Sequence, residues 1–270
     1  MPRLSPKTFP RVVAGLAVAA LAPRCALAGA FNQDEGRGQI IFSQMYSGAG
    51  EGYDVTGKLT SASRFQKLET SALVEYGVTD RLTAILKPSF VNWRTSGPPD
   101  ASYTGPGMTE AGAQIRLAKH GSTVFAAQAM LRVPGAPDSS NLALVGATRV
   151  EQEIRGLAGH GFEIGDWSAF IDLQVGYRWR HGGPPSEWRG DFTLGARPAK
   201  DWMLLLQSFN TISASSSSTI FPKTSSSKLQ ASVVHDVTKT VSLQLGGFGA
   251  VAGRNALRER GLIAALWLRF

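Results

Sequence analysis

Hydrophobic and polar residues alternate along much of this chain, and the alternation is longest in the stretch WSAFIDLQVGYRWR, residues 167–180. Every second side chain from Trp167 to Trp179 is apolar, while the positions between them are polar apart from Phe170 and Gly176. A period of two predicts a β-strand with one face in an apolar medium. The run exceeds the usual length of about 5–6 residues for a soluble strand and suits a tilted strand that crosses a bilayer.

The same alternation recurs elsewhere in the chain. It is found in residues 65–76 (FQKLETSALVEY), 109–118 (TEAGAQIRLA), 188–197 (WRGDFTLGAR) and 261–270 (GLIAALWLRF). Two features depart from the pattern. Pro88 interrupts the predicted strand over 82–93, where we expect a β-bulge because proline cannot donate to a ladder. Ile263 and Trp267 fall on the inward side of the last strand.

The connections between these strands form a short set and a long set. The short set has the Gly, Asp, Pro and Lys residues of tight turns and comprises residues 77–80, 119–122, 163–166, 198–201 and 236–239. The long set is rich in Gly, Pro and Ser and comprises residues 47–61, 95–108, 134–148, 181–186, 210–227 and 252–258. Five short and six long connections join 12 strands, a number that we expect to hold within about two. This pattern predicts an all-β fold, a transmembrane antiparallel up-and-down β-barrel with short periplasmic turns, longer extracellular loops and both termini in the periplasm.

Aromatic residues support this architecture at both ends of the predicted strands. The chain ends on Phe270 with alternating apolar residues before it, which resembles the signature that barrel insertion machinery recognises. Further aromatics lie at strand ends, where amphipathic rings favour the membrane interface: Tyr76, Trp167, Trp179, Trp188 and Trp202. We therefore expect outer-membrane lipid and lipopolysaccharide around the barrel and the insertion machinery as a partner.

The first 28 residues have the three parts of a secretory signal peptide. A basic start is followed by an apolar run over 12–22 and by the small-residue site ALA at 26–28. We expect a signal peptide over 1–28 and an outer-membrane barrel over 29–270. Removing the signal peptide takes away four of the 28 basic residues and none of the 20 acidic ones, so the formal net charge falls from +8 to +4. Export and this modest charge argue against nucleic acid as a partner, and the loss of Cys25 leaves no cysteine for a disulfide or a metal site.

Charged residues occupy the inward positions of the predicted strands. The candidates for lining a pore are Glu69, Glu75, Arg116, Asp172, Arg178, Arg180, Arg189, Asp191 and Arg197. The other inward charges are Lys67, Lys87, Glu110, Arg132, Glu151, Glu153, Arg155, Lys228 and Arg269. Such charges must be hydrated or paired, so we expect a polar lumen, and the excess of basic residues favours anionic solutes. A 12-stranded barrel lies between filled and open sizes, so a narrow pore and a lumen plugged by ion pairs are both open alternatives.

No motif for catalysis, nucleotide binding or metal binding stands out in the sequence. GEGYDVTGKL, residues 50–59, lacks the Ser or Thr that a P-loop needs after Lys58. The histidines lie in or near predicted turns and loops without an obvious serine partner, at His120, His160, His181 and His235. We therefore predict no catalytic residue, no metal ligand and no cofactor. A barrel enzyme acting on lipid stays an alternative, because a nucleophile and its base can meet across strands.

Two segments of the chain carry a family resemblance. They are LVEYGVTDRLT (73–83) and DLQVGYRWRHGGPPSEWRGDFTLGARP (172–198). They resemble bacterial outer-membrane proteins named for the MetA pathway of phenol degradation, and the resemblance covers most of the chain from QDEGRGQIIFSQ (33–44) onward. It implies a signal peptide, a barrel and transport of small molecules, aromatic or apolar ones among them, and it supplies no catalytic residues. The charged inward positions argue against an aromatic substrate here.

The sequence thus predicts a monomeric channel or transporter in the cell outer membrane, which passively admits small solutes through a charged lumen. It does not specify the solute. Two alternatives stand beside the lipid-acting enzyme. One is a closed structural barrel whose loops bind a partner, and the other is a soluble secreted β-sandwich.

Overall fold

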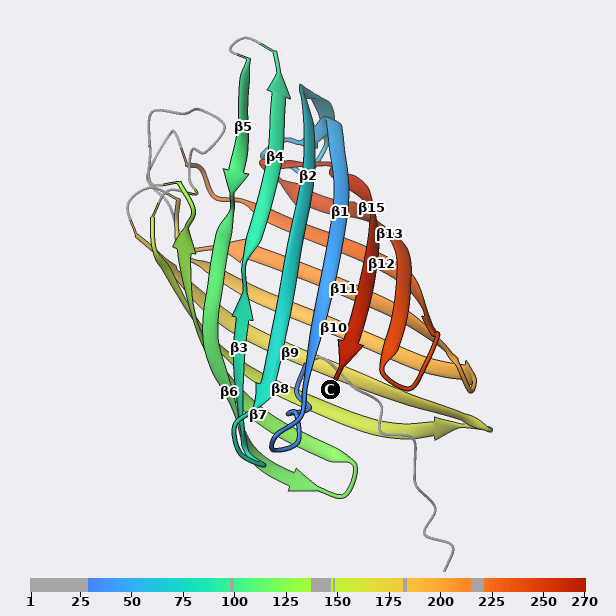
Figure 1. Cartoon of the computed structure of the whole chain (residues 1–270). Helices are drawn as coiled ribbons and strands as arrows, with labels where there is room; N and C mark the ends of the chain where they lie inside the picture. The colour runs from blue at the N-terminus through green and yellow to red at the C-terminus, as the bar shows by residue number, and fades with distance from the viewer. Residues whose placement is uncertain (1–28, 98–99, 137–146, 148, 182–183, 215–220) are drawn as a thin grey trace, which may run out of the picture.

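The computed structural model describes residues 29–97, 100–136, 147, 149–181, 184–214 and 221–270. The predicted signal peptide, residues 1–28, lies outside the described residues. The described chain forms 15 β-segments that join into a closed antiparallel barrel of 12 strands, which confirms the predicted fold class (Figure 1). Among these residues there is no helix long and apolar enough to cross a membrane.

The strands follow one another around the wall in chain order. Their bounds are β1 (Gly38–Tyr53), β2 (Leu59–Gly77), β3 (Leu82–Lys87), β4 (Ser89–Ser96), β5 (Ala101–Pro106), β6 (Met108–His120), β7 (Thr123–Pro134), β8 (Glu151–Ile164), β9 (Trp167–Arg180), β10 (Glu187–Ala199), β11 (Trp202–Ser213), β12 (Ser225–Asp236), β13 (Val241–Arg254), β14 (Ala256–Leu257) and β15 (Arg260–Arg269). Each strand pairs with its neighbours along the chain, and β15 returns to pair with β1. This is the up-and-down order that alternating turns and loops predicted.

Three of the twelve strands consist of two segments each, namely β3 with β4, β5 with β6, and β14 with β15. Pro88 separates β3 from β4, yet both segments keep a single register along β2. The bulge expected at Pro88 lies on the next strand instead. Between the pairs Lys87–Glu110 and Phe90–Pro106, the strand formed by β5 and β6 has one residue more than the strand formed by β3 and β4. There the Gly107 amide donates to the Ser89 carbonyl at 2.8 Å, so the ladder closes around the proline.

The first and last strands close the barrel. β1 pairs with β15 in one continuous register, and Gly38 and Phe270 extend this ladder by exchanging both backbone hydrogen bonds at 3.0 Å. Gly38 has no Cβ, and one placed there would lie 2.7 Å from the Phe270 ring. The terminal aromatic therefore completes the seam at the short-turn end, with its ring still half exposed.

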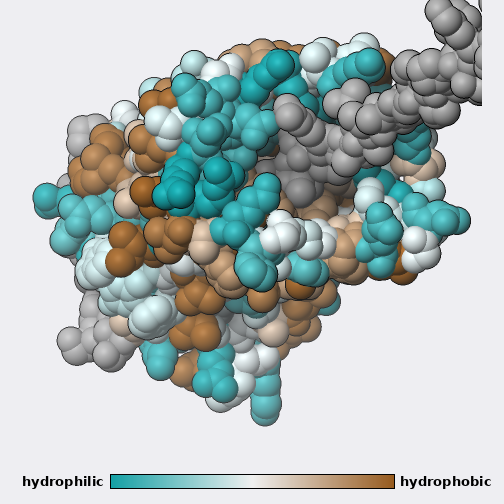
Figure 2. Space-filling view, turned by 90° about the horizontal axis from the view of Figure 1, so that it is seen from below, coloured by the Kyte–Doolittle hydropathy of each residue, from teal (hydrophilic) through white to brown (hydrophobic). Residues whose placement is uncertain are grey.

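The outward positions of the wall are apolar and exposed. Leu117, Val175, Leu245 and Leu262 leave between 60% and 67% of their surface uncovered. Figure 2, seen from the short-turn end, shows hydrophobic residues open on the outside of the molecule. Keeping one such side chain in water rather than in an apolar medium costs about 1.5–3 kcal/mol. The wall as a whole therefore requires an apolar surrounding.

The five predicted interface aromatics all face outward and lie in two groups. Tyr76, Trp167 and Trp202 lie beside the short turns, while Trp179 and Trp188 lie at the long-loop ends of β9 and β10. Two belts at opposite ends of a wall are the arrangement that a bilayer favours. Their contact with the membrane interfaces stays a prediction.

Three of the predicted long loops, 47–61, 95–108 and 252–258, are wrong, because strands run through most of each, and in the last of them β13 reaches Arg254 and β14 covers Ala256–Leu257. β1 continues to Tyr53 and β2 begins at Leu59, so their ladder extends beyond a register shift between Ala49 and Glu51. In the second region β4 pairs with β5. Gly, Pro and Ser residues suggested loops there, but main-chain pairing in a hairpin continues wherever the neighbouring strand continues.

Candidate functional site in the barrel lumen

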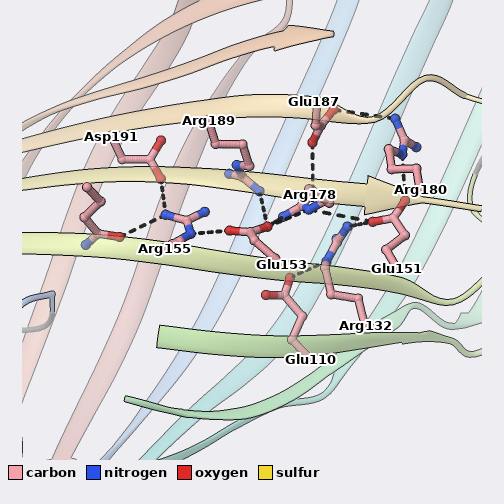
Figure 3. A network of polar contacts seen from close by, with 11 residues as sticks. Glu110, Arg132, Glu151, Glu153, Arg155, Arg178, Arg180, Glu187, Arg189 and Asp191 are labelled. Atoms are coloured by element: carbon pink, nitrogen blue, oxygen red, sulfur yellow. Dashed lines mark hydrogen bonds and ion pairs between the residues drawn. The ribbon is translucent and has the colours of Figure 1, made fainter. Parts of the chain in front are cut away.

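Ion pairs cover one side of the lumen. Five arginines and five carboxylates from β6 to β10 point inward and interlock there (Figure 3). They are Glu110, Arg132, Glu151, Glu153, Arg155, Arg178, Arg180, Glu187, Arg189 and Asp191. Alternation brings every second residue of a strand to this face, and the antiparallel register sets opposite charges side by side. We call these ten residues the lumen network.

Arg178 of β9 lies at the centre of the lumen network. Its register partner on β8 is Glu153, whose carboxylate lies 2.5 Å from the guanidinium. Glu187 of β10 lies 3.0 Å away and Glu151 3.8 Å away. All four side chains are nearly covered, with exposed fractions of 3% to 10%. Charges this deeply buried are tolerated only because they are paired and hydrogen-bonded. Removing any one of the four would therefore leave a buried charge without its partner.

The lumen network continues on both sides of this centre. Toward β6, Arg132 lies 3.2 Å from Glu110 and also contacts Glu151. Toward β10, Arg155 lies 2.6 Å from Asp191. Five positive charges meet five negative ones, so this wall is close to neutral. The excess of basic residues that the sequence showed is therefore not located here.

A hydrophobic cluster fills part of the lumen nearer the short turns. Its buried members are Ile41, Phe170, Met203, Leu205, Val234, Ala265 and Trp267, with Phe31 and Leu73 packed against them. Trp267, which departed from the expected pattern, is buried here and donates its ring N–H to Gln244 at 3.0 Å. Phe170 lies across Gly195, where any Cβ would overlap its ring. The sequence led us to expect a polar lumen. The structure shows that this layer of the lumen is apolar.

The first described residues enter the barrel at the short-turn end. We call residues 29–33 the N-terminal segment. Ala30 is fully buried against Ala126 of β7 and Leu157 of β8, and its amide donates to Asp172 of β9 at 2.6 Å. The segment has no alternation and forms no strand, so sequence reasoning missed it.

Two amide side chains hold the N-terminal segment in place. Asn32 donates to the Gln114 carbonyl at 3.2 Å, and Gln33 donates to Glu75 at 3.0 Å. Glu75 also accepts from Gln39 at 2.6 Å. Among the described residues, this predicted pore-lining carboxylate therefore has amide donors and no ion pair.

The predicted pore-lining residues all lie on the inner face but in separate places. The lumen network holds Arg178, Arg180, Arg189 and Asp191. Glu69 of β2 lies 3.0 Å from Lys67, and Arg197 lies 2.7 Å from Asp236 beside a short turn. Glu75 and Asp172 contact the N-terminal segment. Whether these residues line a conducting pore stays a prediction.

Sequence reasoning also left one member of the lumen network without a role. Glu187 is the first residue of β10 and follows a region predicted as loop, so no alternation preceded it to show which face it occupies. In the sequence, only its spacing could have indicated that Glu187 faces inward. It lies two residues before Arg189 and four before Asp191, which places all three on one face of a strand.

Two cavities lie inside the wall at different heights. One of about 500 Å³ lies beside the short turns and is lined in part by Phe31, Arg116, Lys119, Phe162, Phe170 and Arg197. The other, of about 220 Å³, lies beside the lumen network and is lined in part by Lys67, Glu69, Lys87, Trp93, Glu110 and Arg132. Each is large enough for a small polar solute, and basic side chains reach both.

An ion pair anchors the last outer connection. Glu259, between β14 and β15, pairs with Lys228 of β12. Burial opposes the ionisation of Glu259, but the charges of Lys228 and Lys67 outweigh it and hold the pKa of this carboxyl below its ordinary value. Glu259 is therefore ionised at neutral pH and ties the connection to the inner wall.

Two of the four histidines, His160 and His235, have side-chain partners in the described part of the chain. The His160 ring lies 2.8 Å from the Thr123 hydroxyl, and the His235 ring lies over Trp202 with centroids 4.3 Å apart. No group of three or more His, Cys, Asp or Glu side chains that could hold a metal ion occurs among the residues that the structure describes.

No known family model matches the chain, and no curated protein matches it. Solved structures do. The COG4313 outer membrane channel from Pseudomonas putida F1 matches with a TM-score of 0.67 at 14% identity, over 90% of this chain and 99% of that one. The NanC porin matches with 0.54 at 8% identity, over 86% and 100%.

The translocator domain of the autotransporter NalP from Neisseria meningitidis matches with a TM-score of 0.52 at 10% identity, over 89% of this chain and 91% of that domain. Identities this low show a shared fold and nothing finer. The chain therefore has the fold of outer-membrane barrels, among them a channel and a porin. Membership of the phenol-degradation family is not confirmed.

Proposed function

We propose that this chain is an outer-membrane channel that admits small solutes by passive diffusion. One observation carries the proposal, namely that the usual distribution of residues is inverted. Leucines such as Leu245 and Leu262 are open on the outside, while Arg178 and its carboxylates are buried inside a closed ring. A soluble protein places these residues the other way round. A closed barrel in a bilayer satisfies both, because it has no unpaired edge and keeps its charges away from lipid.

The proposal includes export and orientation. Residues 1–28 would be removed during export, and both ends of the barrel chain would face the periplasm with the short turns. Phe270 would be read by the insertion machinery, and the five end aromatics would lie at the two membrane interfaces. Lipid and lipopolysaccharide would surround the wall. The shared fold with a channel and a porin of outer membranes supports this location.

The lumen favours small hydrophilic solutes with a mild preference for anions. The lumen network is neutral and leaves selectivity to charges elsewhere. Arg116 and Lys119 line the cavity beside the short turns and form no ion pair within the described residues. Basic side chains at a constriction attract anions. We name no specific solute.

A closed structural barrel is the second candidate, and a specific observation favours it. The hydrophobic cluster and the N-terminal segment together occupy the lumen at the short-turn end. If neither moves, no solute passes, and the outer connections would carry the function by binding a partner.

Planar-bilayer recordings of the purified barrel separate the two candidates. Slower or faster migration of the unheated chain on a denaturing gel first verifies that the barrel is folded. A channel gives discrete conductance steps and admits small sugars or amino acids in a liposome-swelling assay. Silence of the folded barrel at all voltages and salt concentrations rejects the channel. We propose no enzymatic activity, and release of fatty acid from phospholipid or lipopolysaccharide by the pure barrel would contradict this.

A further inference from the structure

Asp172 is a buried carboxylate that forms no ion pair with any residue that the structure describes. It is 2% exposed, and it accepts hydrogen bonds from the Ala30 amide at 2.6 Å and from the Gln174 side chain at 2.7 Å. The ion pairs between described residues include none to Asp172. The charged groups that act on it are Asp191 and Arg155, and Arg155 is already engaged within the lumen network. Because a buried charge is costly unless it is paired, this carboxylate needs a positive partner.

The start of the N-terminal segment lies directly against this carboxylate. A Cβ placed on Gly29 would come within 2.5 to 2.7 Å of the Asp172 carboxylate atoms, and Gln114 holds the Gly29 carbonyl at 2.9 Å. A backbone nitrogen lies about 2.5 Å from the Cβ position of its own residue, so the Gly29 nitrogen is no farther than about 5 Å from Asp172. The next nitrogen, that of Ala30, is already bonded to it. Two consecutive main-chain nitrogens around one anion form a recurrent binding arrangement.

We infer that cleavage between Ala28 and Gly29 creates an α-ammonium group that pairs with Asp172 and fixes the N-terminal segment inside the barrel. The inference rests on the proposed removal of residues 1–28. Before cleavage, the Gly29 nitrogen is a neutral amide with one proton to donate. After cleavage it carries a positive charge and three donors, and Asp172 still has lone pairs to accept them because only two donors use it.

Glycine is the residue that this arrangement needs at the new terminus. A side chain on Gly29 would overlap the carboxylate, because a Cβ there would lie 2.5 to 2.7 Å from its atoms. A larger first residue would hold the ammonium group away from Asp172. The small-residue cleavage site and the packing inside the barrel therefore point to the same position, although they are independent observations.

The reactivity of the new amine tests this inference. The chain is purified from outer membranes, its N-terminus is determined by mass spectrometry, and the folded barrel is labelled with acetic anhydride at a series of pH values. Pairing with a carboxylate raises the pKa of an amine above its ordinary value near 8, and a rise of about 1 unit should make labelling at pH 8 about 5-fold slower than in Asp172→Asn. Asparagine keeps the shape and the burial and removes only the charge. Asp166→Asn, in the exposed turn between β8 and β9, should label at the rate of the unchanged chain.

Each failure has its own meaning. An N-terminus other than Gly29 rejects the proposed cleavage and the inference with it. Equal labelling rates at Gly29 in the unchanged chain and in Asp172→Asn reject the ion pair and leave the cleavage intact. If Asp172→Asn does not assemble, the unchanged chain decides by itself. A half-maximal labelling pH near the ordinary value of about 8 rejects the pair, and one at least about 1 unit higher supports it.

Discussion

Arg178 and Glu153 face each other across β9 and β8, and two guanidinium nitrogens of Arg178 lie 2.5 and 2.6 Å from the same Glu153 oxygen. Both side chains are nearly buried, so bulk water could not solvate either charge if the pair were broken. This pair holds the centre of the lumen network, so its removal reports on how much the barrel depends on that network.

Replacing Arg178 by glutamine should destabilise the barrel by about 3–5 kcal/mol, because it leaves three buried carboxylates without their shared cation. The free energy of unfolding in urea, measured on the barrel in lipid vesicles, gives the difference. Arg94→Gln is the matched control, since Arg94 is exposed on β4, and it should change stability by less than about 0.5 kcal/mol. A loss of similar size in both variants would mean that the network does not stabilise the wall.

Gly159 of β8 makes room for the N-terminal segment, and a Cβ there would lie 2.7 Å from the Phe31 ring and 3.1 Å from Ala30. Gly159→Val should therefore displace the segment from the lumen. We expect its first residues to become sensitive to protease and, if the barrel conducts, the single-channel conductance to rise. Gly156→Val on the same strand meets no atom within 4 Å and should change neither. An unchanged protease pattern in Gly159→Val would contradict this placement.

Arg116 and Lys119 should set the anion preference, because the lumen network is neutral. Replacing both by glutamate should shift the reversal potential in a salt gradient toward cation preference by at least about 10 mV. Lys200→Glu with Lys239→Glu makes the same change in net charge in exposed short turns at the same end. That control should shift the potential much less. Equal shifts would show that the overall field, not the cavity lining, decides selectivity.

The pair of Glu259 with Lys228 should make the last outer connection sensitive to acid. The pKa of Glu259 is lowered in the folded state, so its stabilising contribution is present above the unfolded value, which is near 4.3, and is lost as the pH falls through the folded value. The protection of residues 255–259 against hydrogen exchange, relative to the intrinsic exchange rate at each pH, should fall below about pH 4. Glu259→Gln should show the weak protection already at pH 7, and protection that does not change with pH in the unchanged chain would contradict the pairing.

Phe270 should matter for assembly more than an ordinary outward aromatic does. Phe270→Ala removes the ring that packs on Gly38 at the seam, and we expect a several-fold smaller fraction of chains in the heat-modifiable, folded form. Phe270→Trp should restore that fraction because an aromatic ring again ends the strand. Phe42→Ala removes an exposed aromatic from β1 and should have little effect. Equal losses at Phe42 and Phe270 would show that the terminal position has no special role.

Much of the wall could be predicted from the sequence. Strand β9 alternates over its whole length, and the tight turns after β2, β6, β8, β10 and β12 follow Gly, Asp, Pro and Lys residues. The bulge near Pro88 was expected, but its placement on the neighbouring strand at Gly107 was not. A register shift is shared by two strands, and one strand's sequence does not say which of them carries the extra residue.

The partners of the lumen charges could not be predicted. The alternation placed both Arg178 and Asp172 on the inner face, yet Arg178 became the centre of three ion pairs and Asp172 came to face the chain's own N-terminal segment. The position of a residue in the alternation determines whether its side chain faces inward or outward. It does not determine which side chain it contacts, because that depends on strand register and on segments that enter the lumen from elsewhere in the chain.

The sequence by itself determined the closed 12-stranded barrel and its apolar outside, because alternation and turn residues act locally and main-chain pairing then follows from strand to strand. Only the tertiary structure decided what fills the inside. Ala30 meets Asp172 across 142 positions of chain, and the hydrophobic cluster joins β1, β9, β11, β12 and β15. Such contacts form only after the ring closes, when side chains from distant strands share one dry space, and no local pattern records them.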